Sequence, residues 1–125
     1  MDIHGHGSEV YFFEEDCYKI ELDKIRELPG GEKFMIYFFD GPHEVMDHYL
    51  AVVNFFPILE DLSILIIDDW NLAEVQSGTD AALEQLPVDV LYKLEITSEF
   101  HTTKQESTSY TGYHNGCCIF VLKKH

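Results

Sequence analysis

The sequence predicts an α/β domain whose mostly parallel sheet closes on a pair of antiparallel strands. Continuous apolar runs of strand length alternate with segments whose apolar residues recur at helical spacing. The last two apolar runs have no helical segment between them. A strand-helix-strand order requires crossover connections and parallel neighbours, whereas two strands joined by a loop pair in antiparallel fashion. With 125 residues, the chain is expected to form a single domain, residues 1–125.

The first elements are expected to be short. Residues 10–13 (VYFF) predict a strand, and residues 18–28 predict a helix that Pro29 and two glycines end. Residues 34–39 (FMIYFF) form a continuous, aromatic-rich run, which is typical of a strand covered on both faces. Residues 1–8 predict a flexible tail, although their HGH sequence leaves metal binding as an alternative.

The remaining elements alternate between helix and strand. They are an amphipathic helix over 44–59, a turn over 60–63 (EDLS), a buried strand over 64–67 (ILII), a helix over 73–86, and strands over 88–96 and 117–122. Ser77-Gly78 is expected to interrupt the second helix, because glycine disfavours helix interiors. The polar residues 97–116 predict a hairpin connection or a mobile loop.

Charge and cysteine content exclude several classes of protein. Only 8 Lys and Arg stand against 23 Asp and Glu, which gives a formal net charge of −15. Nucleic acids and anionic membrane surfaces are therefore excluded as partners, because both require cationic side chains. The 3 cysteines show no CxxC spacing, which argues against a disulfide framework or a structural zinc site. Without a secretory leader or a membrane-length apolar run, the chain is expected to be cytoplasmic.

Acidic side chains directly follow two of the predicted strands. Asp40 follows the strand over 34–39, and Asp68 with Asp69 follows the strand over 64–67. If these strands are neighbours, the three carboxylates meet at the sheet edge where open α/β sheets bind ligands. Grouped carboxylates need a cation or a raised pKa, and their oxygens suit Mg²⁺, Mn²⁺ or Ca²⁺. The alternative is that Asp40 and Asp69 cap the helices that follow them.

Other polar and aromatic side chains lie near these acids in the sequence. His43 is a candidate general base, since histidine titrates near neutrality, or a surface hydrogen-bonding residue. Trp70 offers a face for stacking on a ligand or a packing residue, and Asn71 offers an amide oxygen. Tyr113 and His114, in the polar loop, either close over a substrate or belong to an exposed hairpin.

The stretch FFDGPHEVMDHYLAVVNFFPILEDLSILIIDDWNLAEVQSGTDAAL resembles the later half of class I, Rossmann-like S-adenosylmethionine-dependent methyltransferases. Its DG-x-H and DD-aromatic motifs resemble those of a branch that includes metal-dependent sugar O-methyltransferases. The likeness is specific over roughly residues 34–86, and the closing strands resemble the family's last antiparallel pair. The resemblance implies a partial Rossmann-like sheet and a divalent cation held by Asp40, Asp68 and Asp69. It also implies a catalytic base at Asp40 or His43.

The motifs with which the family binds its methyl donor are missing. Members use a glycine-rich loop after strand one and an acid at the end of strand two, whereas Gly30 and Gly31 follow a helical segment. We therefore expect a truncated methyltransferase-like domain that is inactive alone. It would methylate a small hydroxyl acceptor only when a partner or a dimer completes it. A non-catalytic remnant or interaction module, or a simple divalent-metal binder, is the alternative.

The missing first strand of the family fold also affects association. Without that strand, residues 34–39 present a long apolar edge, which is a template for pairing with another chain. Residues 10–13 are one candidate to cover this edge, through a strand-helix-strand connection. Otherwise two chains are expected to pair through their exposed edges, so we predict a homo-oligomer.

Overall fold

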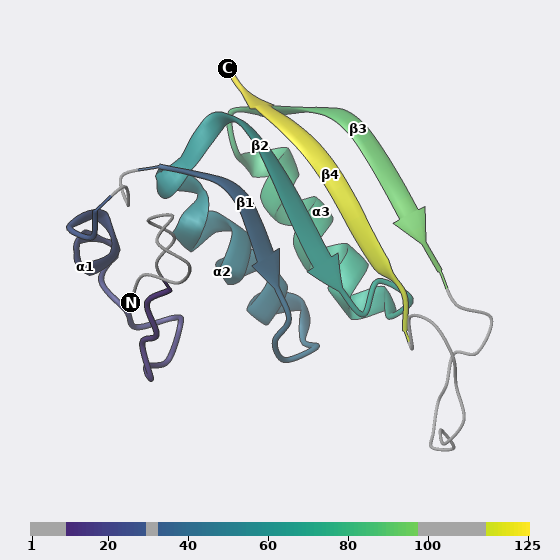
Figure 1. Cartoon of the computed structure of the whole chain (residues 1–125). Coiled ribbons are helices and arrows are strands. Elements are labelled where there is room, and N and C mark those ends of the chain that lie inside the picture. The colour runs from purple at the N-terminus through teal and green to yellow at the C-terminus, as the bar shows by residue number, and fades with distance from the viewer. Residues whose placement is uncertain (1–9, 30–32, 98–114) are drawn as a thin grey trace.

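The computed structural model describes residues 10–29, 33–97 and 115–125, which form a four-stranded sheet with two long helices behind it (Figure 1). In chain order the elements are α1 (Leu22–Arg26), β1 (Phe34–Phe39), α2 (Val45–Phe55), the 3₁₀ helix η1 (Phe56–Ile58), β2 (Leu59–Asp68), α3 (Ala73–Gln85), β3 (Val88–Ile96) and β4 (Cys117–Lys124). None of the described helices combines the length and the apolar character that crossing a membrane requires.

The strands lie in the order β1-β2-β4-β3. β1 and β2 are parallel, while β4 is antiparallel to both β2 and β3. The α/β class and the closing antiparallel pair are therefore confirmed. Mostly parallel pairing is wrong, because β4 enters the sheet between β2 and β3 and separates two strands that run in the same direction.

Four predicted elements differ from the structure in type or length. Residues 10–13 form no strand, so β1 pairs with β2 alone within the described part of the chain. Residues 60–63 belong to β2 rather than to a turn, because pairing with β4 extends this polar stretch; Ser63, for example, pairs with Leu122. α1 has only 5 residues, and α2 gives way to η1 at Pro57, which cannot donate a helical hydrogen bond.

α3 continues without a break through Ser77 and Gly78, so the predicted interruption is wrong. A Cβ atom on Gly78 would lie 2.2 Å from the carbonyl oxygen of Val45 and 3.0 Å from the Cβ atom of His48. Glycine therefore lets α2 and α3 approach closely. This packing offsets the helix propensity that glycine lacks relative to alanine, about 1 kcal/mol.

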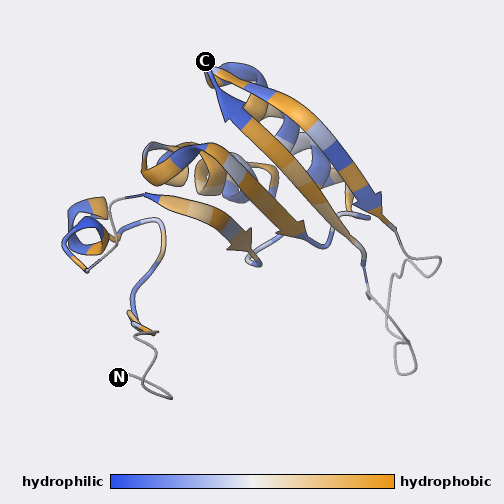
Figure 2. Cartoon of the chain, turned by 45° about the horizontal axis from the view of Figure 1, so that its top comes forward, coloured by the Kyte–Doolittle hydropathy of each residue, from blue (hydrophilic) through white to orange (hydrophobic). Residues whose placement is uncertain are grey.

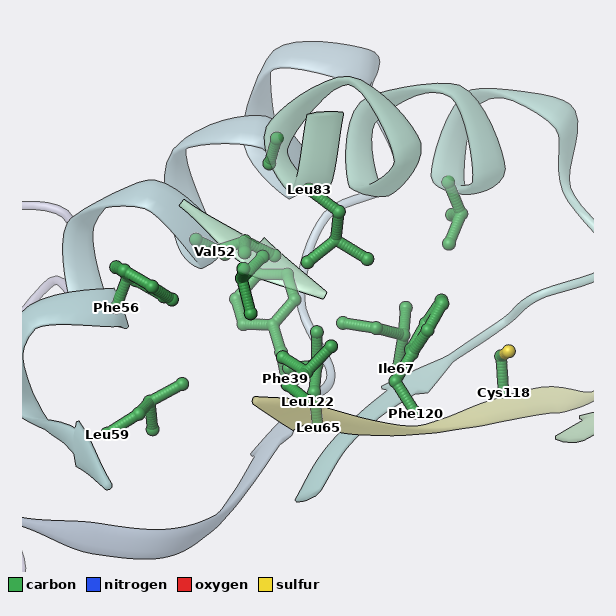
Figure 3. Packing of buried hydrophobic residues seen from close by; sticks show 14 of the residues in the cluster. Phe39, Val52, Phe56, Leu59, Leu65, Ile67, Leu83, Cys118, Phe120 and Leu122 are labelled. Atoms are coloured by element: carbon green, nitrogen blue, oxygen red, sulfur yellow. The ribbon is translucent and has the colours of Figure 1, made fainter. Parts of the chain in front are cut away.

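Alternation along the strands gives the sheet a covered face and an open face. The covered face lies against α2 and α3, and its central side chains are at most 1% exposed (Figure 3). These side chains are Leu65, Ile67, Cys118, Phe120 and Leu122. On the open face, Ile36 and Phe38 are 57% and 56% exposed. The prediction that β1 is covered on both faces is therefore wrong, although the strands are apolar along most of their length (Figure 2).

Candidate metal site

The parallel pairing of β1 with β2 brings the predicted acids together. Phe39 pairs with Ile67 at the carboxyl ends of the two strands, so Asp40 and Asp68 follow at the same edge of the sheet. One carboxylate oxygen from each of Asp40, Asp68 and Asp69 lies within 4.8 Å of the others. The neighbour relation that the sequence suggested is thus present, and the three carboxylates are close enough to contact one cation.

Asp68 is the acid whose ionisation this environment opposes most clearly. Burial raises the pKa of Asp68 from 3.8 to about 6, and the negative charge of Asp69 and a hydrogen bond with Asp40 act in the same direction. A backbone hydrogen bond from Asp69 partly counteracts the shift. A bound proton relieves the repulsion among the carboxylates, and a divalent cation would relieve it by displacing that proton.

Asp69 is fixed by its backbone and by two side-chain contacts. Its φ of +58° is in the left-handed region, which aspartate tolerates better than most residues. The side chain is 14% exposed. Its Oδ2 lies 2.8 Å from Nε2 of His43, and its Oδ1 accepts a hydrogen bond from Nδ2 of Asn115 at 3.3 Å. This unusual backbone conformation thus holds the carboxylate between the loop after β1 and the start of β4.

The two histidines near the acids have different environments. The His43 side chain is 49% exposed, and its partner is Asp69 rather than the nearer acid in sequence, Asp40. His48 on α2 is 1% exposed, and its ring lies edge-on to Phe39 with centroids 5.0 Å apart. Burial lowers the pKa of His48, and its ring nitrogens have no hydrogen-bond partner of normal geometry among the described residues. His48 is therefore a neutral packing residue, and His43 is the accessible one.

Helix capping does not explain the acids. The N-cap residues are Glu44 for α2 and Leu72 for α3. The backbone N–H of Glu44 donates to the Asp47 carboxylate at 3.3 Å, and Asp69 accepts from the Leu72 backbone through its carbonyl, not its side chain. The capping alternative for Asp40 and Asp69 is therefore wrong, since neither carboxylate caps a helix; the contacts of the Asp69 carboxylate are those with His43 and Asn115.

Of the predicted substrate residues, the structure describes Trp70 and Asn71. Trp70 is 1% exposed, donates from Nε1 to Glu95 at 2.7 Å and lies edge-on to Phe120, so it is a core residue rather than a stacking surface. The backbone N–H of Asn71 donates to the carbonyl of Asn115 at 2.7 Å. Tyr113 and His114 lie outside the described residues.

Asn115 is the site residue that sequence reasoning missed. It ends a long polar stretch that carries no motif, and only the position of β4 beside β2 places it against Asp69. Comparison of the chain with protein-family models, with curated proteins and with solved structures gave no match. A function for the chain is therefore argued from the geometry of this edge.

Proposed function

We propose that the acidic edge of the sheet binds a divalent cation of the Mg²⁺ type and presents a hydroxyl-bearing ligand to His43. The observation that carries the proposal is the approach of Asp40, Asp68 and Asp69 to within 4.8 Å of one another. Their oxygens are the hard ligands that Mg²⁺ and Mn²⁺ prefer. The raised pKa of Asp68 supports the proposal, because it reflects a burial and repulsion that a cation would compensate.

His43 is the base in this proposal. When its Nε2–H donates to Asp69, Nδ1 is left as an acceptor that can take the hydroxyl proton. The contact with Asp69 fixes the ring, and the half-exposed side chain is accessible to a ligand. The cation would supply one further effect, which is to acidify a hydroxyl that it coordinates. Asp40, as the more exposed carboxylate, is assigned to the cation rather than to proton transfer.

The resemblance to class I methyltransferases suggests O-methylation of a small hydroxyl acceptor. The described residues do not fit S-adenosylmethionine itself, because no described strand is followed by a glycine-rich loop; the turn after β1 has Gly41 alone. Methylation would therefore need a partner chain, or a dimer, that supplies the donor site. A non-catalytic interaction module is the second candidate, and the open face of the sheet favours it.

A Mn²⁺ titration followed by the electron paramagnetic resonance signal of the free ion tests the cation site. We expect Asp40→Asn and Asp68→Asn each to weaken binding at least tenfold, because each removes a charged ligand. Asp89→Asn is the matched control, since Asp89 is an exposed acid on β3 whose partner is His125. Equal binding by all four proteins, or no binding by the wild type at millimolar Mn²⁺, would contradict the proposal.

Calorimetric titration with S-adenosylhomocysteine, with and without Mg²⁺, separates methyl transfer from the second candidate. Micromolar binding would support a donor site that is completed across a dimer or from other residues. The absence of binding at millimolar ligand would leave the cation site standing and would favour the interaction module.

A further inference from the structure

The open face of the sheet is the largest feature that the proposed function does not use. Its residues point away from α2 and α3, as the register of the strands requires. Cross-strand pairing arranges them in two adjoining rows. One row is Ile36, Ile64, Val121 and Tyr92, and the other is Phe38, Ile66, Ile119 and Leu94.

The exposed apolar area is close to what a protein interface needs. Ile36, Phe38, Leu62 and Tyr92 are 56% to 57% exposed, and Leu94 is 40% exposed. These five side chains alone present roughly 500 Å², taking about 200 Å² for each when fully exposed. The partly buried residues of the two rows add to this area. A standard interface buries about 800 Å² on each partner, and a typical monomer exposes no apolar patch above about 600 Å².

The distribution of charge on the open face indicates what covers it. The two rows contain no charged residue, although the chain has a net charge of −15. Lys123 lies beyond one row, paired with Leu62 and Asp89, and Asp68 lies beyond the other row, next to Asp40. If a second copy packs on this face with its strands running in the opposite direction, the two apolar rows of one copy lie against the two apolar rows of the other. This arrangement also places each Lys123 opposite the Asp68 end of the other copy.

We propose that the open face is the interface of a twofold-symmetric homodimer, with the axis running across the strands. Two sheets that pack face to face lie about 10 Å apart, with strand directions within about 30° of alignment. The interface is isologous, so each copy buries the same two rows. This dimer uses the face of the sheet, and it leaves the outer edges of β1 and β3 unpaired. The matching of the apolar rows does not depend on cation binding. The charge match with the Asp68 end does, because a cation bound there would neutralise the acids, so the charge-reversal variants are measured in the presence of a chelator.

Sedimentation velocity at micromolar concentrations tests the dimer. The wild type is expected to sediment as a dimer, and Phe38→Glu and Leu94→Glu as monomers, because each introduces a charge into the apolar interface. Met46→Glu is the matched control: Met46 on α2 is 57% exposed, lies away from the open face and should leave the dimer intact. Circular dichroism should show the same helix content in all four proteins.

A wild type that is monomeric at these concentrations would overturn the proposal. The proposal would also be overturned if Met46→Glu dissociated the dimer as fully as Phe38→Glu and Leu94→Glu do, because the added charge alone would then account for the effect.

Charge reversal tests the direction of the axis. Lys123→Glu should raise the dissociation constant of the dimer several-fold, since it places like charges opposite each other. The double variant Lys123→Glu with Asp68→Lys should recover the dissociation constant of the wild type. Its charges are exchanged, so residue 123 of one copy again faces an opposite charge at position 68 of the other. Failure of the double variant to recover affinity would rule out the end-for-end arrangement.

Discussion

The two faces of the sheet carry similar side chains in different surroundings. Phe120 on the covered face is 1% exposed, whereas Phe38 on the open face is 56% exposed. α2 and α3 lie on the first face, and no described element lies on the second (Figure 1). Hydrophobicity shows that burial of a strand residue is favourable, but it does not identify the surface that buries it. The run FMIYFF therefore predicted cover on both faces, and the described chain supplies it on one.

The largest expected effect is the difference in the free energy of unfolding that is lost when Phe120 or Phe38 is replaced by alanine. Phe120→Ala should lower the free energy of unfolding by about 3–5 kcal/mol, because it leaves a cavity in the packed core. Phe38→Ala should cost about 1 kcal/mol or less in the monomer, since more than half of its surface is already in water. Urea unfolding measured at low protein concentration checks both values.

Repeating the Phe38→Ala measurement at high protein concentration sharpens the comparison. If the open face is a dimer interface, the wild type gains stability with concentration and the variant gains less, so their difference grows. A concentration-independent difference would mean that Phe38 has no partner in solution.

A smaller effect is expected where the two covering helices meet. Gly78→Ala should cost roughly 1–3 kcal/mol, because its Cβ atom would lie 2.2 Å from the Val45 carbonyl oxygen and would force α2 and α3 apart. Ser77→Ala, at the adjacent exposed position of α3, is the control and should change stability by a few tenths of a kcal/mol at most. Thermal unfolding of the two variants checks this, and equal melting temperatures would show that the close approach has no energetic role.

The smallest effect concerns Asp68, at the end of the open face. Its pKa of about 6 in the fold exceeds the ordinary 3.8, so the folded state binds the proton more tightly than the unfolded state. The stabilisation is therefore complete below about pH 4 and is lost as the pH rises through about 6. Asn at position 68 does not titrate, so Asp68→Asn does not lose stability in this way. The free energy of unfolding of the variant, relative to that of the wild type, should therefore increase as the pH rises from about 4 through about 6. Urea unfolding from pH 4 to pH 7 measures the change, and parallel curves would contradict the raised pKa.

The sequence predicted those elements whose signal is local. β3 spans the predicted residues 88–96, α3 spans nearly all of 73–86, and the acids after two strands meet because those strands are neighbours. The predicted turn over 60–63 failed because pairing with a strand far along the chain overrides the local preference of polar residues.

Contacts between distant segments could not be predicted from the sequence. The pairing of His43 with Asp69 depends on the left-handed turn at Asp69, and Asn115 reaches the site only through the position of β4. The burial of Trp70 likewise depends on its contacts with Glu95 and Phe120, which are far along the chain and cannot be predicted from a local pattern. Local periodicity specifies an element, while the partner of that element depends on the whole chain.

The position of β4 has a consequence for folding kinetics. β2 and β3 run in the same direction but never pair, because β4 forms between them although it is the last described strand in chain order. Before β4 pairs, β3 has no partner among the described strands, and one long edge of β2 is unpaired. Completion of the sheet therefore requires β4 to pair with both strands, and the high sequence separation between β2 and β4 should slow this step. Intermediates that lack β4 would carry the greatest tendency to aggregate, since they expose an unpaired apolar strand on a nascent sheet.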